Sequence, residues 1–356
     1  MDLQKIYSDD NDILMAFAES RIGGRPENQD SYGWKQTDLG YLVTVCDGMG
    51  GGPGGKTAST IAVKEIIGGI AESNKDEETP NVIIKAIRRA NMAIISEGNE
   101  RPELKGMGST ATVLLISERS AFVAHVGDSR VYQLRGHQKV FRTFDHSMVF
   151  DMVKQGVITE EQARLSSQSN VITRALGVKP DVEVDIKELP YEKGDRFVLC
   201  SDGVHGCMPE KKLIQMFTSH RISLGAMTDD ITTFVDNLGR TSGGGHDNLT
   251  LAIIEMKTNS KLKPTMSKLT KITITGLIAL FAISTILNIV QCNSSNRSFS
   301  EIMDSIPILK DSVLKKDSTI NALKLSMKDI EEQVGKINGG NGASIDSIKE
   351  IIRKNK

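Results

Sequence analysis

The sequence predicts an α+β domain in which helices pack on antiparallel β-sheet, followed by one membrane-spanning helix and a helical tail. Three observations lead to this prediction. Residues 1–256 contain short apolar runs, several joined by very short turns, between longer segments of helical periodicity. Residues 272–290 contain no charged side chain. Beyond that segment, apolar residues recur in alternate steps of four and three, as in a coiled coil.

Six apolar runs have the length of β-strands. The run at 110–117 is separated from the run at 121–126 by the turn ERS, and GDS separates 121–126 from 130–135. Links this short predict antiparallel hairpins. The expected strands are YLVTVC (41–46), TATVLLIS (110–117), AFVAHV (121–126), RVYQLR (130–135), RFVLC (196–200) and LTLAII (249–254). Segments with apolar residues at helical spacing predict helices at roughly 55–72, 80–98, 209–219 and 225–238.

The uncharged segment 272–290, ITITGLIALFAISTILNIV, predicts a single transmembrane helix. As a helix its 19 residues span roughly 28 Å, close to the thickness of a bilayer core. The alternative is a buried core helix, although such helices seldom continue this far without a charge. Five lysines lie between residues 257 and 271 and none follows directly after the segment, so we expect 257–271 to be a basic linker on the cytoplasmic side. The predicted location is therefore the inner (plasma) membrane, with the domain of residues 1–256 in the cytoplasm.

Residues 291–356 are predicted to form a tail outside the cytoplasm. A heptad pattern of about five repeats indicates a coiled-coil-like helix at about 305–337, with Pro307 near its start. The strict period favours association of the tail into a homo-oligomer, and the alternative is a single amphipathic helix lying on another surface. The 44 basic residues balance 45 acidic ones, so the sequence shows no electrostatic footprint for nucleic acid.

Aspartates stand where the predicted strands begin or end, most of them beside glycine. A short acid in this position projects an oxygen into a cleft, and glycine lets other groups approach closely. One Asp-Gly pair is more often a turn, but several converging acids repel each other unless cations lie between them. Oxygen ligands without Cys or His favour Mg²⁺ or Mn²⁺. The acids concerned are Asp30, Asp47, Asp128, Asp202 and Asp247.

Six ordered segments resemble the motifs of the protein phosphatase type 2C family, the metal-dependent serine/threonine phosphatases. They are RPENQD, VCDGMGG, GSTAT, HVGDSR, LCSDG and GGHDN. Two further segments, DHSMVFDMVKQGVITEEQA and NVITRALG, resemble the bacterial branch of the family. The resemblance covers roughly residues 10–255 and implies a sandwich of two antiparallel β-sheets flanked by α-helices.

The resemblance also implies a binuclear Mn²⁺ or Mg²⁺ centre with catalytic aspartates. The aspartate of DGMGG, Asp47, is expected to bridge two ions, and the carbonyl of Gly48 to ligate one of them. The aspartates of SDG and HDN, Asp202 and Asp247, complete the shell of the other ion. Asp30 is expected to hold a water bound to a metal.

Two more residues acquire roles from the same resemblance. Asp128 of the GDSR segment matches an acid that helps to form a third metal site in bacterial members, together with the SDG aspartate. Arg25 matches the arginine that binds the substrate phosphate, which suits the bidentate geometry of a guanidinium group.

The implied activity is hydrolysis of phosphoserine and phosphothreonine in proteins by metal-activated water. Two cations about 3.5–4 Å apart can share a water and lower its pKa, so that it attacks phosphorus in line. The expected partners are phosphorylated proteins, among them a cognate serine/threonine kinase or its substrates.

Two other functions fit parts of the sequence. Residues Gly50–Thr57 match the P-loop pattern G-x-x-x-x-G-K-[ST], which predicts a nucleotide hydrolase, although P-loop folds need parallel strands. If the match is a coincidence, Lys56 is expected to be a surface charge that points away from the ions. The second alternative is a catalytically silent, membrane-anchored binding module. The presence of every expected ligand aspartate disfavours it.

Overall fold

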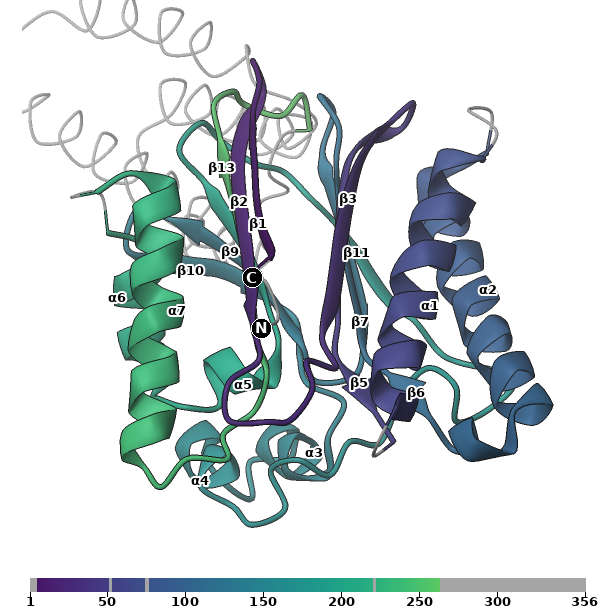
Figure 1. The fold of residues 1–356 in the computed structure, drawn as a ribbon. Helices are drawn as coiled ribbons and strands as arrows, with labels where there is room; N and C mark the ends of the chain where they lie inside the picture. The colour runs from purple at the N-terminus through teal and green to yellow at the C-terminus, as the bar shows by residue number, and fades with distance from the viewer. Residues whose placement is uncertain (1–4, 51–52, 74–76, 220–221, 263–356) are drawn as a thin grey trace, which may run out of the picture. The chain divides into compact units, whose positions relative to one another are not determined.

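The computed structural model describes residues 5–50, 53–73, 77–219 and 222–262, which form two β-sheets packed face to face (Figure 1). All strand pairs in these residues are antiparallel. Sheet A contains, in spatial order, β1 (Lys5–Asp10), β2 (Leu14–Arg21), β13 (Leu249–Met256), β12 (Arg196–Cys200), β9 (Arg130–Arg135) and β10 (Gln138–Arg142). Sheet B contains β11 (Asp185–Leu189), β8 (Ala121–Val126), β7 (Ala111–Ile116), β4 (Gly40–Cys46) and β3 (Ser31–Thr37).

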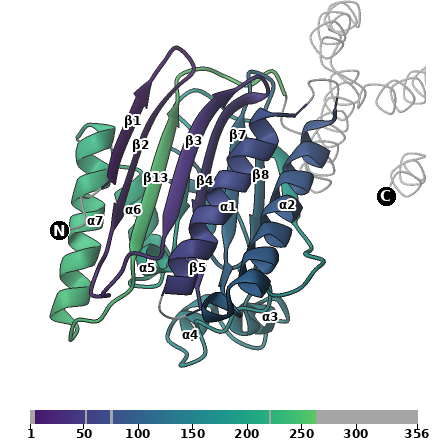
Figure 2. The same ribbon diagram turned by 45° about the vertical axis from the view of Figure 1, so that its right-hand side comes forward.

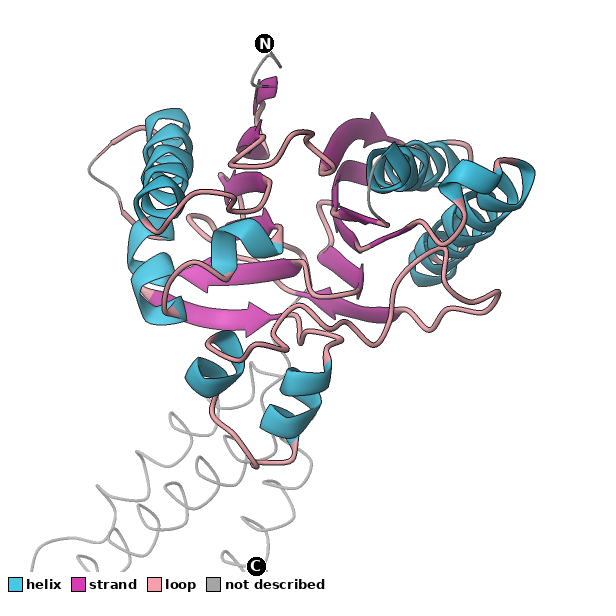
Figure 3. Ribbon diagram, turned by 60° about the horizontal axis from the view of Figure 1, so that its bottom comes forward, coloured by secondary structure: helices cyan, strands magenta, loops and turns pink. Residues whose placement is uncertain are grey.

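Long helices cover the outer face of each sheet, so the layers follow the order helix, sheet, sheet, helix (Figure 2). On sheet B lie α1 (Pro53–Ala71) and α2 (Thr79–Glu100), and on sheet A lie α6 (Glu210–Phe217) and α7 (Leu224–Thr241). Three short helices, α3 (Met148–Lys154), α4 (Glu160–Arg164) and α5 (Asp202–His205), lie at the end of the sandwich that Figure 3 turns toward the viewer. A 3₁₀ turn (Pro102–Leu104) follows α2, and β5 (Gly48–Met49) pairs with β6 (Gly108–Ser109).

The central strands are apolar on both faces because both faces are covered. In β7 every residue is buried: Val113 and Leu115 pack toward α1 and α2, while Leu114 and Ile116 pack toward sheet A. This explains why the strand reads as a continuous apolar run and not as an alternating pattern. The helices are amphipathic, and α2 buries one stripe that consists of Val82, Ile83, Ala86, Ile87, Ala90, Asn91 and Ile94.

The predicted α+β class and the antiparallel sandwich flanked by helices are confirmed, and the four expected helices and six expected strands are all present. The expected hairpin 110–117/121–126 is the β7–β8 pair, with Ala111 opposite Val126. The second expected hairpin is wrong, because β8 belongs to sheet B and β9 to sheet A. The chain crosses between the sheets at Gly127, whose φ of 101° permits this change of direction.

The antiparallel sheets also contradict the P-loop alternative, since a P-loop requires a parallel sheet with crossover connections. The predicted transmembrane helix at 272–290 and the heptad helix at 305–337 lie outside the described residues, as does most of the linker 257–271. Within the residues that are described, no helix is long and apolar enough to cross a membrane.

Candidate active site

The five predicted aspartates meet at the end of the sandwich where α5 and β5 lie (Figure 1). In sheet B, Asp47 follows β4 and Asp30 precedes β3. In sheet A, Asp202 follows β12 and Asp247 lies just before β13. Asp128 lies on the crossing between the two sheets, directly after Gly127. Both sheets therefore contribute acids to one cluster.

Electrostatic interactions show how closely the acids converge. The pKa of Asp47 is raised well above its usual value, first by burial and then by the charges of Asp30, Asp202, Asp128 and Asp247. Asp47 therefore lies within electrostatic reach of the other four acids. A group of acids this dense is unfavourable when ionised unless positive charge lies among them.

The pKa values of Asp202 and Asp30 are raised in the same way. Burial, more than any other cause, raises the pKa of Asp202 to about 7 and that of Asp30 to about 6. For Asp202, the neighbouring Asp247 and Asp30 raise it further, while a hydrogen bond with Asp47 lowers it. In Asp30, hydrogen bonds from Thr250 and Ser201 oppose the rise.

The cluster fits a hard divalent cation. In the described part of the chain, Oδ1 of Asp30 and Oδ1 of Asp202 are buried and have no hydrogen-bond partner. Buried polar atoms are almost always paired, so two unpaired carboxylate oxygens in one cluster point to a cation that would bind them. Oxygen-only ligation is what Mg²⁺ and Mn²⁺ prefer.

The backbone around Asp47 is held by the GSTAT segment. The Asp47 amide donates to Oγ1 of Thr110 (2.9 Å), and its carbonyl accepts from the Thr110 amide (2.8 Å) and from Oγ of Ser109 (3.0 Å). Gly48 allows a close approach here, because a Cβ at this position would lie 1.9 Å from the carbonyl oxygen of Gly55. The ligand role of the Gly48 carbonyl stays a prediction.

Arg25 lies at the edge of the cluster and is half exposed. Its Nη2 donates to Oδ2 of Asp247 at 2.8 Å, and Oδ1 of Asp247 accepts from the Asn248 amide at 2.9 Å. In this arrangement the guanidinium group binds one of the predicted metal ligands. Several of its five N–H donors still remain for an anion such as phosphate.

Comparison with known proteins agrees with this site. Residues 19–243 match the protein phosphatase 2C family. The chain belongs to this family. A serine/threonine phosphatase, stp, of Listeria monocytogenes is 32% identical over 241 residues, which are 67% of this chain and 93% of that protein. Protein phosphatase PhpP of Streptococcus pneumoniae is 32% identical over 237 residues, covering 65% of this chain and 93% of PhpP.

Solved structures of other phosphatases share the fold. The serine/threonine phosphatase of S. agalactiae superposes with a TM-score of 0.62 at 30% identity, covering 68% of this chain and 99% of that one. The catalytic domain of the phosphatase PstP, in complex with two manganese ions, gives a TM-score of 0.57 at 27% identity, covering 68% of this chain and 98% of the other. Members of the protein phosphatase 2C family depend on Mn²⁺ or Mg²⁺, and the acid cluster described above suits these ions.

Two residues that sequence reasoning missed hold the phosphatase site together. Asn248 donates from Nδ2 to the carbonyls of Ile22 (2.7 Å) and Glu27 (2.9 Å), and its Oδ1 accepts from the Gln29 amide (2.9 Å). It therefore holds both sides of the loop that carries Arg25. In the sequence, only the HDN segment could have indicated a role for Asn248, and we had assigned a role to its aspartate alone.

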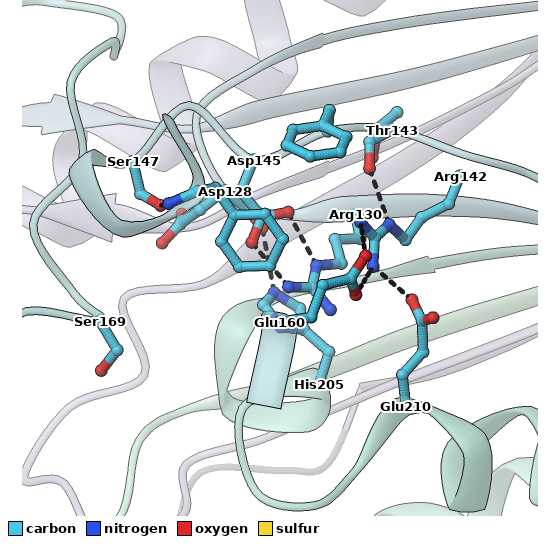
Figure 4. A network of polar contacts seen from close by, with 12 residues as sticks. Asp128, Arg130, Arg142, Thr143, Asp145, Ser147, Glu160, Ser169, His205 and Glu210 are labelled. Carbon is cyan, nitrogen blue, oxygen red and sulfur yellow. Dashed lines mark hydrogen bonds and ion pairs between the residues drawn. The ribbon is translucent and has the colours of Figure 1, made fainter. Parts of the chain in front are cut away.

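The second missed residue is His205, which lies on α5 together with Asp202. Its Nε2 donates to the backbone carbonyl of Asp128 at 3.0 Å, so one short helix supplies an acid and supports another (Figure 4). Behind it, Arg130 makes two 2.7 Å bonds to the carboxylate of Asp145, and both side chains are buried. Asp145 is thus neutralised by its own partner and does not belong to the metal cluster.

A separate group, His125, His146 and Asp185, brings ligand-type atoms within 4.8 Å of one another. The ring nitrogens of His146 and the carboxylate of Asp185 already have partners within the protein. Nδ1 of His146 accepts from the Gly127 amide (3.0 Å), and its Nε2 lies 3.3 Å from Oδ2 of Asp185 and 3.1 Å from Nη1 of Arg174. Nη1 of Arg174 donates to Asp185 at 2.8 Å, which places a cation in the group. We interpret the group as a brace for the Gly127 crossing.

The structure also corrects the expectation for Lys56. Its side chain is half-buried, and its Nζ donates to the backbone carbonyl of Asp30 at 2.8 Å. The prediction of a surface charge that points away from the site was wrong. Lys56 lies on the first turn of α1, which faces the loop before β3. The glycine-rich pattern alone does not show which way a side chain on this turn points.

Proposed function

We propose that this chain hydrolyses phosphoserine and phosphothreonine in proteins at a centre of two Mn²⁺ or Mg²⁺ ions. Membership of the protein phosphatase 2C family makes it a metal-dependent protein serine/threonine phosphatase. The observation that carries the proposal is the convergence of five aspartates with two buried, unpaired carboxylate oxygens. When bound, two such ions share and activate a water and neutralise charge that develops on the phosphate.

The proposed ligand roles follow from where each acid lies. Asp47 has all four other acids around it and is the proposed bridge between the two ions. The carbonyl of Gly48 is proposed to complete one shell, and Asp202 and Asp247 the other. A third ion would use Asp128 with Asp202, because after burial the charge of Asp202 is the strongest cause that raises the pKa of Asp128.

The protein's own residues bind the phosphate and orient the water. Asp30 is proposed to position the attacking water through Oδ1, because its other oxygen already accepts from Oγ of Ser201 at 2.7 Å. Arg25 is proposed to bind the phosphate with two parallel N–H donors. To do so it would share or exchange its bond to Asp247, and the Asn248 contacts keep the loop in place during that change.

The silent binding module is disfavoured because no acid of the cluster is missing. A module without catalysis has no need for buried carboxylates that destabilise the fold when they are ionised. The P-loop alternative lacks the parallel sheet, and Nζ of Lys56 is bonded to Asp30 and not placed in an open phosphate cradle.

We further propose that the enzyme is anchored in the inner membrane by residues 272–290, with the phosphatase domain in the cytoplasm. The uncharged 19-residue segment and the lysines that precede it support this proposal. The tail would then lie on the other side and self-associate through its heptads. The relatives named above are phosphatases of bacteria, which supports phosphorylated bacterial proteins as substrates. A cognate serine/threonine kinase among these substrates is part of our proposal.

The test is metal-dependent turnover of a phosphothreonine peptide and of an aryl phosphate by the full-length protein. Activity should require added Mn²⁺ or Mg²⁺ and disappear with chelator. Asp47→Asn should abolish turnover, because a neutral amide binds hard cations poorly. Asp181→Asn, a change at an exposed aspartate, is the matched control and should behave as wild type. Robust turnover by Asp47→Asn after metal removal would exclude the proposed centre.

A further inference from the structure

The glycine-rich match Gly50–Thr57 stands between antiparallel strands, where a P-loop would need parallel ones, yet its lysine makes specific contacts. Nζ of Lys56 donates to the carbonyl oxygen of Asp30 at 2.8 Å and to Oγ of Ser31 at 3.2 Å. Both acceptors lie where the Arg25 loop ends and β3 begins. A residue from the first turn of α1 therefore holds the backbone of a predicted active-site acid.

Asp30 is held from two sides. From sheet A, Oγ of Ser201 donates to its Oδ2 at 2.7 Å. On the α1 side, Lys56 holds its carbonyl, while Oδ1 remains buried and without a hydrogen-bond partner in the described residues. The direction of Oδ1 thus depends on both the carboxylate contact and the backbone contact. A hydrogen bond from an ammonium group is roughly twice as strong as one between neutral groups, so the backbone contact is a firm one.

The same helical turn holds the neighbours of Asp30 as well. Ser59, three residues after Lys56, donates to the carbonyl of Gln29 at 2.5 Å, and its Oγ lies 2.9 Å from Oγ of Ser31. The first turns of α1 thus contact three consecutive residues, 29 to 31. Lys56 is the member of this set that carries charge, and its positive charge interacts with the carboxylate of Asp30.

We propose that Lys56 is a positioning residue for the phosphatase reaction: its ammonium group fixes the backbone at Asp30 so that Oδ1 is directed into the metal cluster. This inference rests on the proposed function. In this proposal Lys56 acts through Asp30 and does not itself bind the substrate or an ion. Partners that orient the groups around a metal in this way commonly affect metal affinity or activity by about 10-fold to 100-fold when they are removed.

The experiment compares Lys56→Met, which removes the donor and the charge, with Lys56→Arg, which keeps both. Lys64→Met is the matched control, because Lys64 is an exposed lysine on the same helix. In the full-length protein, Lys56→Met should lower kcat about tenfold and weaken Mn²⁺ binding, measured by calorimetry, by a similar factor. The KM for an aryl phosphate should change less than about twofold, since Arg25 is untouched. Lys56→Arg should recover most of both losses.

Several results would overturn the inference. One is a Lys56→Met protein that keeps kcat and Mn²⁺ affinity within about twofold of wild type, even if its melting temperature falls, because the lysine would then be only a structural contact. Another is loss of ATP binding in the variant, which would favour the P-loop interpretation again.

If Lys56→Met does not fold, Lys56→Gln replaces it, and equal Mn²⁺ affinity of the Gln and Arg variants would count against the inference. A wild-type protein without Mn²⁺-dependent turnover would instead refute the proposed function itself.

Discussion

Replacing Asp202 with asparagine should make the metal-free protein more stable while it removes activity. Burial and neighbouring acids raise the pKa of Asp202 from 3.8 to about 7 in the folded protein. At pH 7.5 Asp202 is ionised and fully hydrated in the unfolded chain. In the folded chain it must either carry its charge while buried beside other acids or bind a proton, and both states cost free energy. By linkage this difference costs at most on the order of 4 kcal/mol of stability, part of which is shared with the other acids.

The stability difference between Asp202→Asn and the wild type should depend on pH. The cost is largest above pH 7, shrinks as the pH falls through about 7, and disappears below 3.8, the unfolded-state pKa, since Asp202 is then protonated in both states. The asparagine of the variant never carries the charge, and its amide can donate to Asp47. The stability advantage of Asp202→Asn should therefore be about 2–4 kcal/mol at pH 7.5 and below about 1 kcal/mol near pH 4. The histidines with lowered pKa values are common to both proteins and cancel in this difference.

Urea unfolding in the presence of chelator, followed by the fluorescence of Trp34, is a suitable assay. This is the only tryptophan of the chain, and it lies on β3 in the sandwich. Added Mn²⁺ should reduce the advantage of the variant, because an ion at 100 times its dissociation constant stabilises the wild type by about 2.7 kcal/mol and the variant by less. Equal or lower stability of Asp202→Asn at pH 7.5 with chelator would refute the reasoning about the acid cluster.

Three further predictions address other parts of the protein. Arg25→Ala should raise the KM for an aryl phosphate substantially with a smaller effect on kcat, and a KM unchanged in steady-state kinetics would remove the arginine from phosphate binding. Asp145→Asn should destabilise the fold by about 3–5 kcal/mol, because it leaves the buried Arg130 without its partner; a melting temperature equal to that of wild type would contradict this. For the membrane proposal, Cys292 should react with an impermeant thiol reagent in intact cells, while a cysteine introduced at the exposed Lys64 of the phosphatase domain stays unlabelled; the reverse pattern would show the opposite orientation.

Much of the fold and the acid cluster could be predicted because the relevant signals are local. Strands buried on both faces appear as apolar runs, and the aspartates stand directly at their ends. The edge strands β10 and β11 escaped prediction, since QKVFR and DIKEL are mostly polar and only partly buried. Helix α5 has four residues, too few for any periodicity to show.

The sheet to which each strand belongs, and the groups that support the acids, could not be predicted. The GDS link after β8 has the length of a hairpin, yet the chain passes to the other sheet there, because pairing is decided by contacts with distant strands. The bond from the Gln29 amide to Asn248 spans 219 positions, and the bond from Lys56 to Asp30 spans 26. Such partners are found only once the fold has brought them together.

Because the acids come from both sheets, a bound ion does more than prepare a water for attack. Asp30 and Asp47 extend from sheet B, whereas Asp202 and Asp247 extend from sheet A. Any cation shared between them is a cross-link between the two halves of the sandwich, and the energy of binding it is added to the barrier against pulling those halves apart. A shortage of metal in the cell would then do more than slow turnover. It would leave the domain easier for proteases to open, so metal supply would govern the lifetime of this phosphatase together with its rate.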